Sequence, residues 1–480
     1  MEGPSPARSP AAARRGAAPL GALLALLSCL ALSACASGPG QGAATGADGV
    51  GDPIFPRLGN RGYDVAHYAL RLDYDVERRR LDGTAGITAT AAAELRSFSL
   101  DLAGLTVREV TVDGRRATAR RTTDKLVVRP ESPVRKGAVF RTRVDYDGTP
   151  RTLVDPDGST EGWVPTDDGA LVVGEPAGSM TWFPGNNHPS DKAAYDFAIT
   201  VPEGWTALAN GELRDSRTRA GRTTFRWHSG EPMAGYLATA TVGKFEVTRS
   251  TTRSGLPLLV AVDPRVAKRS AGPLSGMARM LEWESGLFGP YPFSSAGAIV
   301  DHEPKDVDYA LEVQTKPVYP DAPDRLTVLH ELAHQWFGNS VTPKTWRDMW
   351  LNEGFATYAE WLWTEQHGGD SAQRTFDKTY AKGEDDPVWE FPPGDPGTAE
   401  NISDDPVYER GAMVLHELRK TVGDRTFFRI LKGWATTYRH RNADSHDFIA
   451  FCEKEAGRDL GGLFAAWLYG EGRPARASSP

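Results

Sequence analysis

The chain has only three cysteines in 480 residues, which leaves little basis for disulfides or for a metal site built from thiolates. Cys29 and Cys35 lie close to the N-terminus, and Cys452 is alone in the remainder of the sequence. A single remaining thiol cannot form an intramolecular disulfide, so the mature chain is expected to fold without one. We expect Cys452 to be a buried apolar residue on a helix.

The sequence also lacks a long hydrophobic run after residue 35 and lacks an excess of basic charge. A membrane-spanning helix needs about 20 consecutive apolar residues, and no later segment reaches that length. The formal charge of −8 becomes −10 once the first 34 residues, which carry three arginines and one glutamate, are removed. This negative charge argues against nucleic acid as a partner.

The first 34 residues have the pattern of a bacterial lipoprotein signal peptide. Three arginines precede the apolar segment 20–34, which is too short to span a membrane and ends in Leu32-Ser33-Ala34-Cys35. Cleavage before Cys35 would let this thiol carry lipid, and we expect the protein to be anchored to the cell membrane on its extracytoplasmic side. An ordinary secretory peptide, with release to the extracellular space, is the alternative. Residues 35–52 are small and flexible, and they are interpreted as a tether.

The remaining sequence divides into a strand-like half and a helical half, which predicts an α+β protein. Residues 53–250 are interpreted as a β-rich domain, because 64–72 and 195–201 alternate between apolar and polar residues. Asp82-Gly83 and Asp113-Gly114 are predicted to form hairpin turns. Residues 251–475 are interpreted as a mostly helical domain that resembles a thermolysin-like catalytic domain.

The helical half contains two expected strands and a series of expected helices. The strands are predicted at 297–301 and 310–313, and the helices at 273–288, 324–337, 352–367, 407–422, 425–439, 446–456 and 460–469. Gly368-Gly369 and Gly423 are predicted to end two of these helices.

The most informative motif is His330-Glu331-Leu332-Ala333-His334. Residues four apart lie on the same face of a helix, so the two imidazoles can bind one metal ion. Glu353, which eighteen residues separate from His334, lies on a second predicted helix and supplies a carboxylate as third ligand. Three protein ligands leave a position for water, which is typical of a catalytic zinc site. Glu331 is placed to take a proton from that water.

The segments around these residues resemble the zinc aminopeptidases of the aminopeptidase N type, a family that includes leukotriene A4 hydrolase. The resemblance rests on 330–339 (HELAHQWFGN) and 346–356 (WRDMWLNEGFA), and it extends from about 64 to about 474. It implies a saddle-shaped N-terminal β domain, a thermolysin-like metallopeptidase domain and one zinc ion per chain. Related divalent metals bind such ligand sets too.

The resemblance also implies residues that hold a free substrate amine and stabilise an oxyanion. Glu312, in Tyr309-Ala310-Leu311-Glu312-Val313, matches the family's amine-binding glutamate, although Tyr309 and Val313 depart from its Gly-Ala-Met-Glu-Asn pattern. Glu175 matches a second amine-binding position on a loop of the β domain. Tyr408 matches the family's catalytic tyrosine, whose hydroxyl stabilises the oxyanion.

The expected activity is that of a zinc aminopeptidase that removes N-terminal residues from peptides with a free amino terminus. A thermolysin-like endopeptidase shares every metal residue, so only Glu312 and Glu175 argue against that alternative. A non-catalytic binding protein on the same fold is a second alternative, and the intact ligands, base and tyrosine argue against it.

Overall fold

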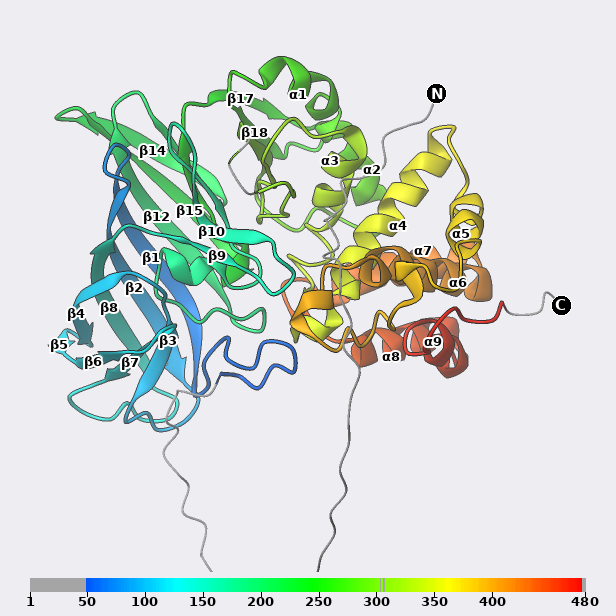
Figure 1. The fold of residues 1–480 in the computed structure, drawn as a ribbon, viewed down its shortest axis with the longest axis horizontal. Coiled ribbons are helices and arrows are strands. Elements are labelled where there is room, and N and C mark those ends of the chain that lie inside the picture. The colour runs from blue at the N-terminus through cyan, green and yellow to red at the C-terminus, as the bar shows by residue number, and fades with distance from the viewer. Residues whose placement is uncertain (1–48, 303, 305–306, 477–480) are drawn as a thin grey trace, which may run out of the picture. The chain divides into compact units, whose positions relative to one another are not determined.

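The computed structural model describes residues 49–302, 304 and 307–476, and Figure 1 shows their fold. The signal peptide, Cys35 and most of the tether therefore lie outside the described residues. Within the described part, strands dominate from blue to green in Figure 1, and helices follow from yellow to red. The α+β prediction, with a β-rich half before a helical half, is confirmed. No helix among the described residues is long and apolar enough to cross a membrane.

The β-rich half is built around an eight-stranded sheet in the order β14-β15-β12-β1-β2-β8-β4-β5. Its strands are β1 (Tyr63–Asp75), β2 (Arg80–Ala91), β4 (Thr106–Val112), β5 (Arg115–Arg116), β8 (Val139–Gly148), β12 (Lys192–Pro202), β14 (Glu212–Arg219) and β15 (Arg222–Ala234). A three-stranded sheet contains β3 (Phe98–Asp101), β6 (Thr118–Arg121) and β7 (Lys125–Arg129). A five-stranded sheet contains β9 (Thr152–Val154), β10 (Thr160–Pro165), β11 (Ala170–Val173), β13 (Thr206–Ala209) and β16 (Ala240–Gly243).

The predicted alternation is confirmed in β1 and β12. Tyr195, Phe197, Ile199 and Val201 are all buried on one face of β12, because successive side chains of a strand point to opposite faces. β12 pairs in parallel with β1, which brings the ring of Tyr195 against Tyr68 of β1. This apolar layer forms the core of the β-rich half.

One predicted turn of this half is confirmed and the other is wrong. Asp113 and Gly114 connect β4 to β5 with left-handed backbone angles, as a tight hairpin requires. Asp82 and Gly83 lie inside β2 instead, paired with β1. A Cβ on Gly83 would lie 2.3 Å from the ring of Tyr146, so this glycine is needed for packing and not for a turn.

The second half contains a four-stranded sheet and nine α-helices among the described residues. The sheet has the order β17-β18-β19-β20, formed by Glu246–Thr251, Pro257–Val262, Ala296–Val300 and Val318–Tyr319. A short pair joins β21 (Thr342–Pro343) to β22 (Asn442–Ala443). The helices are α1 (Ala267–Leu274), α2 (Met277–Phe288), α3 (Arg325–Ala333), α4 (Trp350–Gln366), α5 (Ala372–Tyr380), α6 (Gly411–Val422), α7 (Asp424–Thr437), α8 (Ser445–Ala456) and α9 (Gly461–Trp467).

Most predicted helices are confirmed, with three corrections. The helix expected at 273–288 is divided into α1 and α2, with Pro273 inside α1, and α5 was not predicted. The strand expected at 310–313 is only an isolated bridge between Leu311 and Val318. Gly423 follows α6 and Gly368 follows α4, both with positive φ, as predicted for helix ends. Cys452 is fully buried on α8 with a free thiol, also as predicted.

Helices α4 and α6 cross in direct backbone contact. An ideal Cβ on Gly354 of α4 would lie 2.8 Å from the carbonyl carbon of Gly411, the first residue of α6. Real side chains essentially never approach backbone atoms this closely, so the crossing requires glycine. Because Gly354 follows Glu353 directly, the crossing fixes the position of a predicted metal ligand.

We predict that Gly354→Ala lowers the free energy of unfolding by about 1–3 kcal/mol, because the added methyl group overpacks the crossing. Gly286→Ala in the last turn of α2 is the matched control, since its added Cβ meets nothing within 4 Å. That change should stabilise the protein by about 0.4–1 kcal/mol by restricting the unfolded chain. Urea unfolding of both variants measures the difference, and equal stability would show that the helices do not need this contact.

Candidate functional site

Helix α3 carries the first two predicted metal ligands. The side chain of Asp324 begins the helix by accepting hydrogen bonds from the backbone N–H groups of Leu326 and Thr327, at 2.7 and 2.9 Å. His330 lies in the last turn of α3, and His334 caps its C-terminus. The backbone N–H of His334 still donates to the His330 carbonyl, at 3.2 Å, so both imidazoles lie on one face.

The three predicted ligands meet at one point between α3 and α4. Glu353 Oε2 lies 3.2 Å from His330 Nε2 and 3.3 Å from His334 Nε2. Ligand atoms bound at about 2.0–2.1 Å to a tetrahedral zinc ion lie roughly 3.3–3.4 Å apart, so the spacing agrees with a common zinc ion. Two imidazole nitrogens and one carboxylate oxygen are also the donor set of catalytic zinc sites. The residues present therefore fit zinc.

Each histidine is oriented by a hydrogen bond on the far side of its ring. His330 Nδ1 donates to Glu360 Oε1 at 2.6 Å, and His334 Nδ1 donates to the carbonyl oxygen of Phe337 at 3.1 Å. Such partners fix the tautomer and direct Nε2 toward the metal. The sequence analysis missed Glu360. Its spacing of seven residues from Glu353 places both on one face of α4, which is a usable signal.

The electrostatics of the protein alone favour a charged carboxylate beside charged histidines. Burial opposes ionisation of Glu353, but His334 and His330 outweigh it and lower its pKa to about 2. Burial likewise opposes protonation of His334, while Glu353 and Glu312 raise its pKa to about 9. Burial raises the pKa of Glu331 to about 8, against the effect of the two histidines. A bound divalent cation would take the place of the protons on the two histidines and would lower the pKa of Glu331.

Glu312 and Glu175 also reach this site. One carboxylate oxygen of each lies within 4.8 Å of one another and of a Glu353 oxygen. Glu312 Oε1 and Glu175 Oε2 are buried without a hydrogen-bond partner in the described structure. Burial and the neighbouring Glu312 raise the pKa of Glu175. Two carboxyls this close together, whose buried oxygens lack a hydrogen-bond partner among the described residues, form a site suited to a positively charged group, because buried polar groups are costly to leave unpaired.

Side chains from the end of α3 hold the segment of Glu312. Gln335 Nε2 and Asn339 Nδ2 both donate to the Glu312 carbonyl oxygen, at 3.1 and 2.6 Å. The backbone N–H of Thr315 donates to Gln335 Oε1 at 2.8 Å. These bonds from side chains replace the strand ladder that was predicted at 310–313, and they tie Glu312 to the metal-binding helix.

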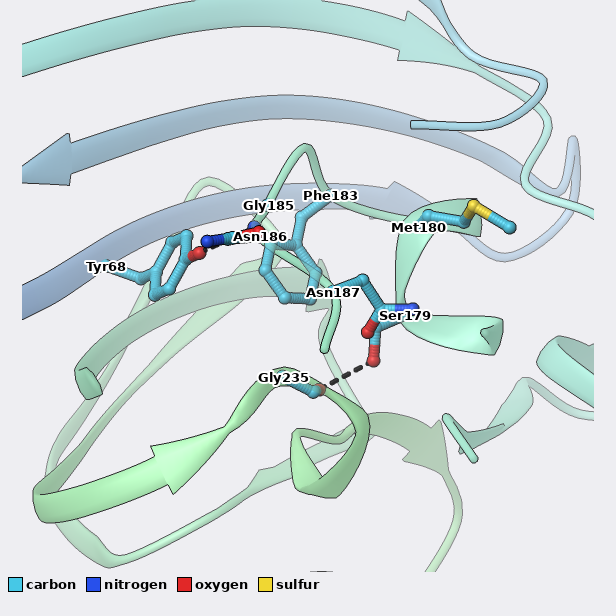
Figure 2. Close-up of a pocket in the computed structure, with 8 residues that line it drawn as sticks. All are labelled: Tyr68, Ser179, Met180, Phe183, Gly185, Asn186, Asn187 and Gly235. Atoms are coloured by element: carbon cyan, nitrogen blue, oxygen red, sulfur yellow. Dashed lines mark hydrogen bonds between the residues drawn. The ribbon is translucent and has the colours of Figure 1, made fainter. Parts of the chain in front are cut away.

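The loop of Glu175 is held from within the β-rich half. Glu161 Oε2 accepts hydrogen bonds from the backbone N–H groups of Ala177 and Gly178, at 3.0 and 2.7 Å. Asn187 Nδ2 donates to the carbonyl oxygen of Pro176 at 3.3 Å. Figure 2 shows Asn187 next to Ser179, whose hydroxyl donates to the Gly235 carbonyl at 2.6 Å. The backbone directly after Glu175 is therefore held by buried hydrogen bonds to Glu161 and from Asn187.

Tyr408 completes the group of predicted site residues. It lies in the π-helical turn Pro406–Arg410 that precedes α6, and such turns occur frequently at functional sites. Its ring stacks on that of His330, with centroids 6.1 Å apart and an angle of 17° between the planes. Burial raises the pKa of Tyr408, and the carboxylates of the site add to this, Glu353 most. The phenol therefore stays protonated at neutral pH and can donate a hydrogen bond.

Comparison with known protein families gives two matches. The Peptidase M1 N-terminal domain matches residues 65–237, and the Peptidase family M1 domain matches residues 321–467. Aminopeptidase M1-C of Oryza sativa subsp. japonica is 25% identical over 449 residues, which are 85% of this chain and 49% of that protein. Rat glutamyl aminopeptidase is 24% identical over 453 residues, 85% of this chain and 47% of that protein. The chain thus spans about half the length of these curated relatives.

Solved structures match over nearly their whole length. An M1 zinc metallopeptidase from Deinococcus radiodurans has a TM-score of 0.81 and 32% identity, covering 90% of this chain and 100% of that chain. A mutant of this enzyme bound to the peptide Tyr-Ser-Ala has a TM-score of 0.82 and 32% identity, covering 89% of this chain and 99% of that chain. The two-domain arrangement of the present chain therefore has a close structural counterpart.

We predict that mutations will distinguish a metal ligand from the catalytic base by their effects on zinc content and turnover. His334→Ala removes a ligand, so the purified protein should lose most of its zinc, measured by mass spectrometry of the metal. Glu331→Ala removes no ligand, so zinc content should remain near one ion per chain while turnover falls by at least about a hundredfold. Full zinc occupancy in His334→Ala, or near-normal turnover in Glu331→Ala, would exclude the respective role.

Proposed function

The chain belongs to peptidase family M1 and takes zinc as its cofactor; from that premise we propose that it is an aminopeptidase that removes N-terminal residues from peptides. The observation that carries this proposal is the pair of buried carboxyls, Glu312 and Glu175, beside the metal ligands. An endopeptidase needs no anionic site at this place. A free N-terminal ammonium is the cation whose chemistry fits two carboxylates next to a zinc site.

The proposed reaction assigns one task to each side chain. His330, His334 and Glu353 would hold the zinc ion, which when bound acidifies water and polarises the scissile carbonyl. Glu331 accepts a proton from the attacking water and later donates it to the leaving amine. The Tyr408 hydroxyl donates a hydrogen bond to the carbonyl oxygen as that oxygen becomes negative.

Substrate position follows from the two amine-binding carboxylates. Glu312 and Glu175 bind the ammonium group, so the first peptide bond is the one beside Glu331. The Deinococcus radiodurans enzyme with bound Tyr-Ser-Ala supports peptides as the substrate class. Tyr309 donates its hydroxyl hydrogen to the Thr160 carbonyl oxygen at 3.0 Å, next to this site, and we propose that it shapes the pocket for the first side chain.

We further propose that the mature protein is lipid-anchored through Cys35 and faces the extracytoplasmic side of the cell membrane. The support is the apolar segment 20–34, whose last residues Leu32-Ser33-Ala34 directly precede Cys35, with a small-residue tether after it. Two acyl chains on one cysteine are enough for stable anchoring, whereas one chain binds only weakly.

The anchor leads to a direct prediction in the native host. Metabolic labelling with a fatty-acid analogue should label the wild-type protein, and Cys35→Ser should abolish that label because the acceptor thiol is gone. Cys452→Ser is the matched control and should keep the label, since this thiol is buried on α8. A wild-type protein that stays unlabelled would refute the anchor and favour an ordinary secreted form.

For the reaction itself, we predict that acetylating the substrate amine lowers kcat/KM by at least about a hundredfold. Hydrogen bonds to charged groups contribute about 1.5–3 kcal/mol each, and acetylation removes the charge from the partner of both carboxylates. Glu312→Ala should lose most of this discrimination while keeping its zinc. Glu390→Ala, which alters an exposed glutamate, should discriminate like wild type. Equal cleavage of free and acetylated peptides by the wild type would favour the endopeptidase alternative.

A further inference from the structure

Arg410, two residues after Tyr408, is a fully buried arginine that binds only backbone carbonyls. Its Nε donates to the Trp467 carbonyl at 3.1 Å, and its Nη1 donates to the Phe391 carbonyl at 3.4 Å. Its Nη2 donates to the carbonyls of Gly470 and, at 3.5 Å, Ala466. No carboxylate among the described residues forms an ion pair with it. Burial lowers its pKa to about 10, so the side chain remains charged at neutral pH.

Three of these four carbonyls belong to the C-terminal end of α9 and the turn after it. The last carbonyls of a helix have no partner within the helix and carry a negative partial charge. The guanidinium of Arg410 therefore caps α9 and ties it to the turn that contains Tyr408. Glu471 favours the charged form of Arg410 electrostatically but forms no ion pair with it among the described residues. A buried cation held mainly by backbone carbonyls is expensive to maintain, which favours a role in fixing a specific geometry.

Tyr408 depends on this turn for its position. Within the described residues its hydroxyl has no hydrogen-bond partner, and its ring contacts the site by stacking on His330. The backbone of the turn is held on one side by the glycine crossing of α4 and α6 and on the other by Arg410. The carboxylate of Glu409 adds an ion pair with Lys382 at 2.5 Å. A shift of this backbone would move the phenol directly, because no bond of its own would hold it.

We propose that Arg410 is a positioning residue: by docking the π-helical turn on the end of α9, it holds the Tyr408 hydroxyl where the substrate carbonyl oxygen becomes negative. The inference rests on the proposed function, since it assigns Tyr408 a catalytic task. It also gives α9 a part in the reaction, although this helix contributes no residue to the group of metal ligands.

The test is a double-mutant cycle on the full-length, zinc-loaded protein with an aminoacyl fluorogenic substrate. Tyr408→Phe should lower kcat by about a hundredfold or more. Arg410→Lys keeps the charge but loses the planar fork of donors, so kcat should fall about tenfold with KM within about twofold. In the Tyr408→Phe background, Arg410→Lys should cost less than about twofold, because the hydroxyl it positions is already absent.

Arg419→Lys is the matched control, since Arg419 lies on α6 and joins it to Glu365 and Asp424 without contacting the turn. It should leave kcat within about twofold in both backgrounds. Gly470→Ala perturbs the same contact from the acceptor side, because its added Cβ would lie 2.5 Å from the Ala466 carbonyl oxygen. Gly470→Ala should therefore lower kcat in the wild-type background and have little effect in the Tyr408→Phe background, as Arg410→Lys does. It replaces Arg410→Lys in the test if that variant fails to fold.

Two outcomes would overturn the inference while leaving the proposed function intact. One is an equal loss of kcat from Arg410→Lys in both backgrounds; the other is an unchanged kcat with only a lower melting temperature. A wild-type protein without turnover would instead contradict the proposed function. Crystal structures of wild type and Arg410→Lys give a readout independent of turnover: the Tyr408 ring should move by about 1 Å, and an unmoved ring contradicts the inference.

Discussion

The tetrahedral spacing of three ligand atoms on two helices is the constraint on which the rest of this structure depends. Glu353 Oε2 must stay 3.2–3.3 Å from both imidazole Nε2 atoms, although α3 and α4 are separate elements. Small relative shifts of the helices would spoil this spacing, because zinc–ligand distances vary by only about 0.2 Å. The bond from His330 to Glu360 links α3 to α4 directly. The glycine crossing with α6 then fixes α4 from its other side.

The same framework places the groups that do not bind metal. Gln335 and Asn339, just beyond His334, hold the backbone of Glu312, so the proposed amine site moves with the metal helix. Lys192 of β12 donates to the carbonyls of Asn339 and Ser340, both at 2.9 Å, and thereby joins the β-rich half to the same turn. The proposed recognition of an amine and the proposed hydrolysis thus share one set of supports.

Local sequence patterns were sufficient to predict most helices, the alternating strands and the convergence of His330, His334 and Glu353, because each depends mainly on spacing along one element. The ligand motif, for example, needs only helical periodicity and the position of Glu353.

Contacts between distant segments could not be predicted in this way. The Asp-Gly pattern predicts a turn at Gly83, whereas the contact that requires this glycine is with Tyr146, which lies 63 residues further along the chain. The strand predicted at 310–313 does not form, because hydrogen bonds from side chains just beyond α3 replace pairing with a neighbouring strand. Glu360 and Arg410 were missed because their partners lie on other elements. The lipid anchor and the individual roles of the site residues stay predictions; these residues are His330, Glu331, His334, Glu353, Glu312, Glu175 and Tyr408.

The central claim is that a zinc site with an adjacent amine-binding pair cleaves only the first peptide bond of its substrate. Mass spectrometry of the products from an unmodified peptide of about ten residues tests this most directly. We expect a series of products, each shorter by one residue at the N-terminus, that disappears with a chelator and returns with added zinc. Internal fragments formed at early times, with the N-terminal residue still attached, would contradict the account.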